Sequence, residues 1–219
     1  MHIELFQYFQ LASLLLAIWC YRGLAGYSLQ LFVPILAITN LLETVGVNYM
    51  QSDQVPNDIF YNLYMVQTTP LYLYLYGKML HLRKNEGTIF RGIFSLVVFF
   101  LLFNFFYWQG MNDFNTYSLI LTEVTHIVFS SLTLIRLSAS DRSQGALARE
   151  PYFWINSGNL LFGLVTLVLL GLQDYIRKHQ IQIEHKALYI AILPTANILL
   201  YSMFGLAFLL CQTRTQSSR

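Results

Sequence analysis

Seven long apolar stretches follow one another along this chain of 219 residues. A helix needs roughly 20 residues to cross ~30 Å of hydrocarbon. Unpaired backbone groups cannot face lipid, and the stretches lack the alternation of barrel strands, so helices are the structure that fits. We therefore predict an all-α, polytopic membrane protein with a single seven-helix transmembrane domain over residues 1–219. The predicted spans are 5–21, 29–50, 59–80, 92–108, 115–138, 152–176 and 188–212.

The composition excludes an ordinary soluble domain. Hydrophobic residues make up 56% of the chain and charged residues only 11%, and the mean hydropathy is +0.50. Soluble domains carry about 25% charged residues, because their surfaces face water. The lipid bilayer is therefore the expected partner. The net charge of +2 is small, so we expect no nucleic-acid partner.

The basic residues predict the orientation of the chain in the membrane. Lys and Arg resist translocation and accumulate in cytoplasmic loops. Ten of the thirteen Lys and Arg residues fall in one set of alternate loops. This asymmetry predicts an outside N-terminus and a cytoplasmic C-terminus. The ten are Arg22, Lys78, Arg83, Lys84, Arg91, Arg136, Arg142, Arg149, Arg214 and Arg219.

Three ionisable side chains, Glu43, Glu123 and His126, lie deep inside the apolar stretches. Charged groups in hydrocarbon are costly, so they normally face the bundle interior or a cavity and mark a site or pathway. With a rise of 1.5 Å per residue, all three lie roughly 9 to 14 Å below the outer ends of their helices. We predict that they bind a small ligand or titrate in an outward-facing polar pocket.

Further polar residues accompany this trio. Gln67, Thr195 and Asn197 lie at a similar depth, roughly 10 to 14 Å, and are expected to orient the ligand. A polar stripe continues toward the cytoplasm at the helical spacings that share one face. The alternative is that these groups hold the bundle together through hydrogen bonds between helices. The stripe consists of Ser130, Thr133, Asn156 and Asn159.

The spacing Glu123-x-x-His126 is also the one that di-iron bundles use to present a carboxylate and an imidazole to one metal. It occurs once here, and the further carboxylates of a di-iron site are missing. We therefore predict no metal and no other cofactor, with Glu43, Glu123 and His126 as the candidate ligands if a single metal binds. The preferred interpretation is a carboxylate hydrogen-bonded to the imidazole, or a pair that titrates together.

Tyrosines recur at near-helical spacing in the third stretch, at Tyr61, Tyr64, Tyr72 and Tyr76, with Tyr74 beside them. Such a stripe can line a cavity for a flat apolar ligand. It can equally serve packing and anchoring at the membrane interface. Both interpretations stay open at the level of sequence.

The sequence favours reception over catalysis. The last stretch has no Lys for a retinal Schiff base, and the chain has no nucleophile elbow or phosphate-binding loop. We expect a receptor-like or sensory protein whose helix displacement is read by a cytoplasmic or membrane signalling partner at the loops around Arg83 and Arg142. The alternatives are a small-solute or proton-coupled transporter, and a lipid-modifying enzyme with Glu123 and His126 as acid and base.

Three short segments resemble a family of small seven-helix integral membrane proteins of Bacteroidota: Leu41-Leu42-Glu43-Thr44-Val45-Gly46, Tyr61-Asn62-Leu63-Tyr64, and the run from Glu150 to Gly158. The resemblance implies the same fold over the whole chain and a bacterial inner membrane. That family has no established biochemical activity, so the resemblance implies none here. In that family an acidic residue often follows the Tyr-Asn pair, whereas this chain has Gln67 instead. The chain therefore lacks one carboxylate that a cluster shared with the family would need.

Overall fold

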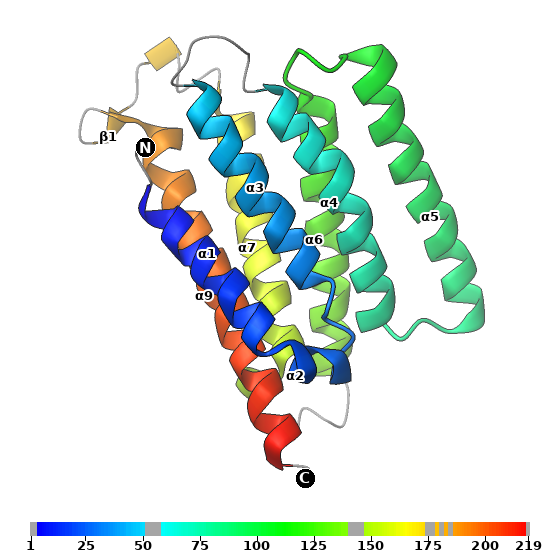
Figure 1. Cartoon of the computed structure of the whole chain (residues 1–219). Coiled ribbons are helices and arrows are strands. Elements are labelled where there is room, and N and C mark those ends of the chain that lie inside the picture. Colours follow the sequence, from blue (N-terminus) through cyan, green and yellow to red (C-terminus); the bar gives the residue numbers. More distant parts are fainter. Residues whose placement is uncertain are drawn as a thin grey trace.

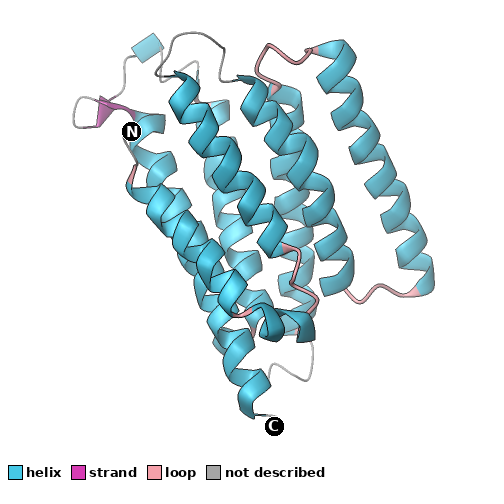
Figure 2. Cartoon of the chain, viewed as in Figure 1, coloured by secondary structure: helices cyan, strands magenta, loops and turns pink. Residues whose placement is uncertain are grey.

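The computed structural model describes residues 4–50, 58–139, 147–173, 178–179, 182–183 and 186–217. Within these residues a long helix occupies each of the seven predicted stretches (Figures 1 and 2). The long helices are α1 (Leu5–Trp19), α3 (Phe32–Met50), α4 (Asp58–Met79), α5 (Lys84–Phe103), α6 (Thr116–Ser138), α7 (Pro151–Gly171) and α9 (Leu188–Ser217).

Short elements connect the long helices. Helix α2 (Tyr21–Gly26) follows α1, and the π-helical turn η1 (Asn104–Trp108) extends α5. A single 3-10 turn, η3 (Leu147–Arg149), precedes α7. Before α9, β1 (Gln182–Ile183) pairs antiparallel with β2 (Lys186–Ala187), a two-residue ladder that the sequence did not predict.

Among the described residues, four helical segments are long and apolar enough to cross a membrane by length and composition: Lys84–Trp108, Thr116–Ser138, Pro151–Gly171 and Ala191–Thr213. Leu5–Trp19 and Phe32–Val45 are shorter apolar helices. Helices with this composition must cover their apolar side chains with lipid or with each other. The chain is therefore a helical membrane protein.

Six of the long helices form a closed ring. Helix α1 packs against α3 and α9, α3 against α4, α4 against α6, α6 against α7, and α7 against α9. Helix α5 lies outside this ring and packs mainly against α4, as Figure 1 shows. The interior of the ring is therefore enclosed by α1, α3, α4, α6, α7 and α9.

An aromatic cluster lies around Phe32, the first residue of α3, and Figure 1 shows that α3 begins at the end of the bundle that carries the C-terminus. Phe32 of α3 contacts Tyr72 of α4 and both Phe204 and Phe208 of α9, with ring centroids 5.0 to 5.8 Å apart. All four side chains are buried, and edge-to-face rings at these distances are favourable. We call these four residues the apolar plug.

Arg136 joins three helices at the same end of the bundle. The last carbonyls of a helix lack partners within the helix, and Arg136 of α6 donates to the carbonyl of Leu80, just beyond α4, at 2.7 Å. Its second nitrogen lies 3.0 Å from Glu86 of α5. Both charged side chains are partly exposed, so water screens the ion pair and it contributes little to stability. We call this arrangement the Arg136 junction.

Asn62 performs a similar role at the opposite end. Its buried amide donates to the carbonyls of Met111 and Asp113 at 3.1 and 2.8 Å and accepts from the backbone N–H of Asn115 at 3.0 Å. These bonds tie the connection between η1 and α6 to the first turns of α4.

Gly23 lets α2 approach the end of α9 closely. A Cβ atom at this position would lie 3.0 Å from the backbone of Cys211 and from Cα of Gln212. Gly26, one turn later in α2, has open space at the same point, with nothing within 4 Å.

We predict that Gly23→Ala lowers the stability of the fold by about 1 to 3 kcal/mol, because the added methyl group must push two backbones apart. Thermal unfolding of the detergent-purified protein measures this loss. Gly26→Ala is the matched control and is expected to leave stability unchanged or to raise it slightly, because Ala favours helices over Gly. An equal loss in both variants would contradict the close α2–α9 contact.

Candidate functional site

The hydroxyl of Tyr76 lies at the centre of a buried polar cluster inside the ring. Tyr76 belongs to α4 and is 0% exposed. Its oxygen lies 2.9 Å from Nδ1 of His126 and 2.9 Å from Oγ of Ser130, both on α6. It also accepts a hydrogen bond from the amide of Asn159 on α7, at 3.0 Å. One hydroxyl thus joins three helices.

These three bonds use the full capacity of a hydroxyl, which has one hydrogen to donate and two lone pairs. Asn159 occupies one lone pair. Either Tyr76 donates to Nδ1 of His126 and accepts from Ser130, or it accepts from His126 and donates to Ser130. The two arrangements differ in which nitrogen of the neutral imidazole carries the hydrogen, so this short network can exist in two hydrogen-bonded states.

The expected hydrogen bond between Glu123 and His126 is not found in the described part of the structure. The imidazole instead bonds Tyr76 and packs edge-on against Tyr72, with ring centroids 4.6 Å apart at 84°. Three residues turn a helix by about 300°, so side chains at this spacing diverge by about 60°. His126 is directed toward α4, whereas Glu123 reaches α7.

Glu123 places a carboxyl group against the backbone of α7. The residue is 5% exposed, and its Oε2 atom has no hydrogen-bond partner among the described residues. A Cβ atom at Gly163 would lie 3.1 Å from Oε2, so the missing side chain makes room for the carboxyl group. A buried polar atom without a partner costs about 1 to 3 kcal/mol. A proton or a ligand that donates a hydrogen bond would reduce this cost.

Glu43 lies half-buried on α3 and pairs with Gln10 of α1. With the amide oriented to satisfy both of its neighbours, the Gln10 nitrogen donates to the Glu43 carboxyl, and the Gln10 oxygen accepts from the backbone N–H of Asn40 at 3.1 Å. Gln10 is fully buried. This pair links α1 and α3 on the opposite side of α4 from Asn159.

Tyr64 of α4 lies between the two carboxyl groups. It is within electrostatic range of both Glu43 and Glu123, and its backbone carbonyl accepts a hydrogen bond from the Thr68 hydroxyl at 2.7 Å. The ring interior therefore holds both carboxyl groups around the tyrosines of α4, and His126 joins the same interior through Tyr76.

The predicted polar stripe is buried throughout. Ser130 and Asn159 bond Tyr76, as described above. Thr133 and Asn156 donate to carbonyls four residues earlier in their own helices, at 2.7 and 2.6 Å. Within this stripe, Ser130 and Asn159 therefore link helices by strong hydrogen bonds. Asn156 adds a weak contact to the sulfur of Met79 on α4 at 3.5 Å.

The structure turns two of the three predicted orienting residues away from the ring interior. Gln67 is exposed on α4. Thr195 is also exposed and donates to the carbonyl of Ala191 in its own helix at 3.3 Å. Asn197 is half-buried on α9. Counting residues predicts depth along a helix, but it does not predict the direction in which each helix turns its faces.

The candidate metal ligands do not converge either. No group of three or more His, Cys, Asp or Glu side chains within the described ranges is close enough to hold a metal ion. Glu43 is held by Gln10 and His126 by Tyr76, so the candidate ligands have different partners. A single-metal site built from Glu43, Glu123 and His126 therefore does not fit this arrangement.

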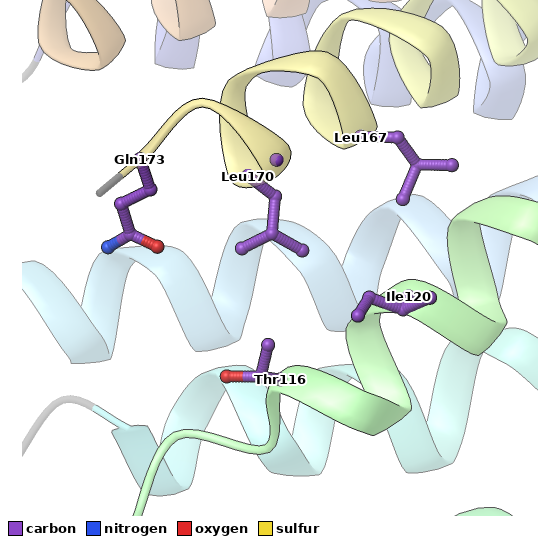
Figure 3. Close-up of a pocket in the computed structure, with 6 residues that line it drawn as sticks. Thr116, Ile120, Leu167, Leu170 and Gln173 are labelled. Atoms are coloured by element: carbon purple, nitrogen blue, oxygen red, sulfur yellow. The ribbon is translucent and has the colours of Figure 1, made fainter. Parts of the chain in front are cut away.

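A groove of about 380 Å³ opens between the start of α6 and the end of α7 (Figure 3). It is not the pocket that the sequence predicted, because no predicted site residue lines it. Ile120 lies one helical turn before Glu123, and Leu167 lies one turn after Gly163, so the groove follows the same α6–α7 contact that holds the carboxyl group. Its lining residues are Thr116, Ile120, Leu167, Leu170, Gly171 and Gln173.

Sequence reasoning missed the roles of Gln10, Gly163 and the Tyr76 hydroxyl. Gln10 was visible as a polar residue within the first apolar stretch. Gly163 continues the spacing of Asn156 and Asn159, which indicated a small residue on the inward face. Nothing in the spacing of the tyrosines distinguished Tyr76 from its neighbours, because its three partners come from other helices.

Comparisons with known proteins add no relative to this picture. No family model, curated protein or solved structure matches the chain. The function is therefore argued from the residues and their geometry.

We predict that Tyr76→Phe lowers stability by about 1 to 3 kcal/mol, because it leaves buried polar groups on α6 and α7 unpaired. Thermal unfolding in detergent is the measurement. Tyr74→Phe removes a hydroxyl from the exposed face of the same helix and should leave the unfolding temperature unchanged. Indistinguishable unfolding temperatures for the two variants would rule out a stabilising role for the Tyr76 network.

Proposed function

We propose that this chain is a receptor-like membrane protein that binds a proton, or a small ligand that donates hydrogen bonds, at Glu123 inside its helix ring. One observation carries the proposal: the buried Oε2 atom of Glu123 has no partner in the described structure. Charge on an unpaired buried carboxyl group is strongly unfavourable. The occupancy of this one site therefore changes the free energy of the surrounding helix packing.

The groove between α6 and α7 is the approach to this site. Ile120 in the groove wall lies three residues before Glu123, which is about 4.5 Å along the helix. Thr116 and Gln173 give the groove polar groups, whereas Ile120, Leu167 and Leu170 line it with apolar surface. A proton or small ligand that enters from this end of the bundle would meet the carboxyl group one turn below the groove.

Several groups would respond to a change at Glu123. The ionisable and polar groups linked to it come from four helices: Tyr64, Tyr72 and Tyr76 from α4, His126 from α6, Asn159 from α7 through Tyr76, and Glu43 from α3 through Tyr64. Occupancy of Glu123 would favour one spacing of α6 and α7, because the carboxyl group lies directly against Gly163.

The Arg136 junction is the proposed output of the receptor. Arg136 belongs to the same helix as Glu123 and holds the ends of α4 and α5. A shift of α6 would therefore displace Glu86 and, with it, the loop around Arg83. The backbone N–H of Arg83 donates a hydrogen bond to the Glu86 carboxylate at 3.0 Å. The second predicted contact for a signalling partner, Arg142, lies outside the described residues.

The finer topology belongs to the same proposal. We propose that all seven long helices span a bacterial inner membrane, with the N-terminus outside and the C-terminus in the cytoplasm. The loops that carry most of the basic residues lie at the end of the bundle that carries the C-terminus (Figure 1), in keeping with the positive-inside rule. The resemblance to a Bacteroidota family supports the bacterial membrane.

A transporter would need a polar route from one face of the membrane to the other. The polar cluster extends from Glu123 to Asn156, and the apolar plug of Phe32, Tyr72, Phe204 and Phe208 packs beside it, with Tyr72 against His126. We prefer reception because the unpartnered Oε2 atom of Glu123 marks a single binding position.

We expect the infrared spectrum of the purified protein near neutral pH to contain the C=O stretch of a protonated buried carboxyl group, because the site accommodates the neutral form of Glu123 better than the charged form. Glu123→Gln should remove this component. Asp113→Asn, in an exposed loop, is the control and should retain it. An unchanged band in Glu123→Gln would assign the proton to a different group and contradict the proposed site.

The response itself can be followed with spin labels at Lys84→Cys and Ala139→Cys, at the exposed ends of α5 and α6. The native Cys20 and Cys211 are buried, so the labels report on the introduced positions. We expect the distance between the labels to change from acidic to alkaline buffer, and Glu123→Gln to abolish this change. Identical distance distributions at both pH values in the protein with Glu123 would overturn reception of protons; the same series with added small amines tests a ligand.

A further inference from the structure

Gln67 is an exposed amide near the middle of a helix. Asn62, Asn104, Asn156 and Asn159 are buried and hydrogen-bonded. Gln67, in contrast, is exposed and makes no hydrogen bond within the described residues. Its amide has two hydrogens and two lone pairs that need partners.

The depth of Gln67 makes this exposure costly. It lies nine residues after Asp58 in a helix of 22 residues, which is about 14 Å along the axis and close to the middle of a ~30 Å hydrocarbon layer. Helix α4 packs against α5 and α6, which are both long and apolar enough to cross the membrane. Water is not available at this depth to satisfy the amide.

The surroundings of Gln67 differ from a lipid-facing surface. Gln67, Tyr74 and Lys78 follow the spacing i, i+7, i+11, which keeps them on one face of α4. All three are exposed, and the Lys78 ammonium lies 5.3 Å from the centre of the Tyr74 ring. We call these residues the α4 face.

The outer surface of α5 provides the contrast, because Ile89, Leu96 and Phe99 are each about two-thirds exposed there. Those side chains suit hydrocarbon, whereas the α4 face presents an amide, a phenol and an ammonium group. Among the described helices, α4 is also too polar to be classed as a membrane span by its hydropathy.

We propose that the α4 face binds a second copy of this chain, so that the protein is a symmetric dimer in the membrane. A two-fold axis along the bilayer normal places the same residue of both copies at the same depth. Gln67 would therefore meet the partner's Gln67, and each amide would donate to the oxygen of the other. Self-complementarity selects this occupant, because an amide is both donor and acceptor, and such bonds between helices stabilise association in lipid.

Energy transfer between donor- and acceptor-labelled full-length protein in liposomes tests this proposal. Over a series of protein-to-lipid ratios, we expect dimers for the unsubstituted protein. Gln67→Leu should raise the apparent dissociation constant by roughly 3- to 20-fold, the range for one or more interhelical hydrogen bonds in lipid. Gln67→Asn keeps an amide and should lose less. Ser95→Leu, which removes an exposed polar group from α5, should leave dimerisation unchanged.

Oxidative cross-linking locates the contact independently of Gln67. A cysteine at Tyr74→Cys should form a disulfide-linked dimer in the membrane, whereas Val128→Cys, which is 46% exposed on α6, should not. A monomer at every lipid ratio would overturn the proposal and leave the α4 face to lipid or to a different protein. A dimer that Gln67→Leu does not weaken, or that cross-links at Val128→Cys instead, would also overturn it.

Discussion

The buried hydroxyl of Tyr76 sets the relative positions of α4, α6 and α7, and the arrangement of the candidate site depends on it. Three hydrogen bonds of 2.9 to 3.0 Å meet at this oxygen. All four side chains are at least partly buried, and a buried polar group that loses its partner is costly, so each partner tends to keep its place. This requirement holds His126 toward α4 and leaves Glu123, one turn earlier, against Gly163 of α7.

The same helix α6 carries both the unpaired carboxyl group and the Arg136 junction. A rigid helix moves as a unit, so a small change in the α6–α7 spacing at Glu123 is transmitted to the ends of α4 and α5. Helix α5 is held mainly by α4 and by this junction because it lies outside the ring. It is therefore the helix that can move with the least loss of packing.

The depth of a residue along its helix could be predicted from the sequence, whereas the rotation of each helix about its own axis could not. The sequence placed Glu43, Glu123 and His126 at one level; in the structure Glu43 pairs with Gln10, Glu123 lies against Gly163 and His126 bonds Tyr76. Gln67 and Thr195 share that level but face outward. The rise per residue is constant, so depth follows from counting. The rotation of a helix depends on which neighbours pack against it, and single-helix spacing carries little of that information.

The sequence by itself determined the class of protein, because apolar stretches of this length with so few charges can only be helices in lipid. It also showed which ionisable groups lie far from the ends of those helices. Only the tertiary structure decided which partner each of them has: Gln10 for Glu43, Tyr76 for His126, and a glycine backbone for Glu123. The physical reason is that hydrogen bonds between helices depend on the order and rotation of six helices around one ring, which no single segment encodes.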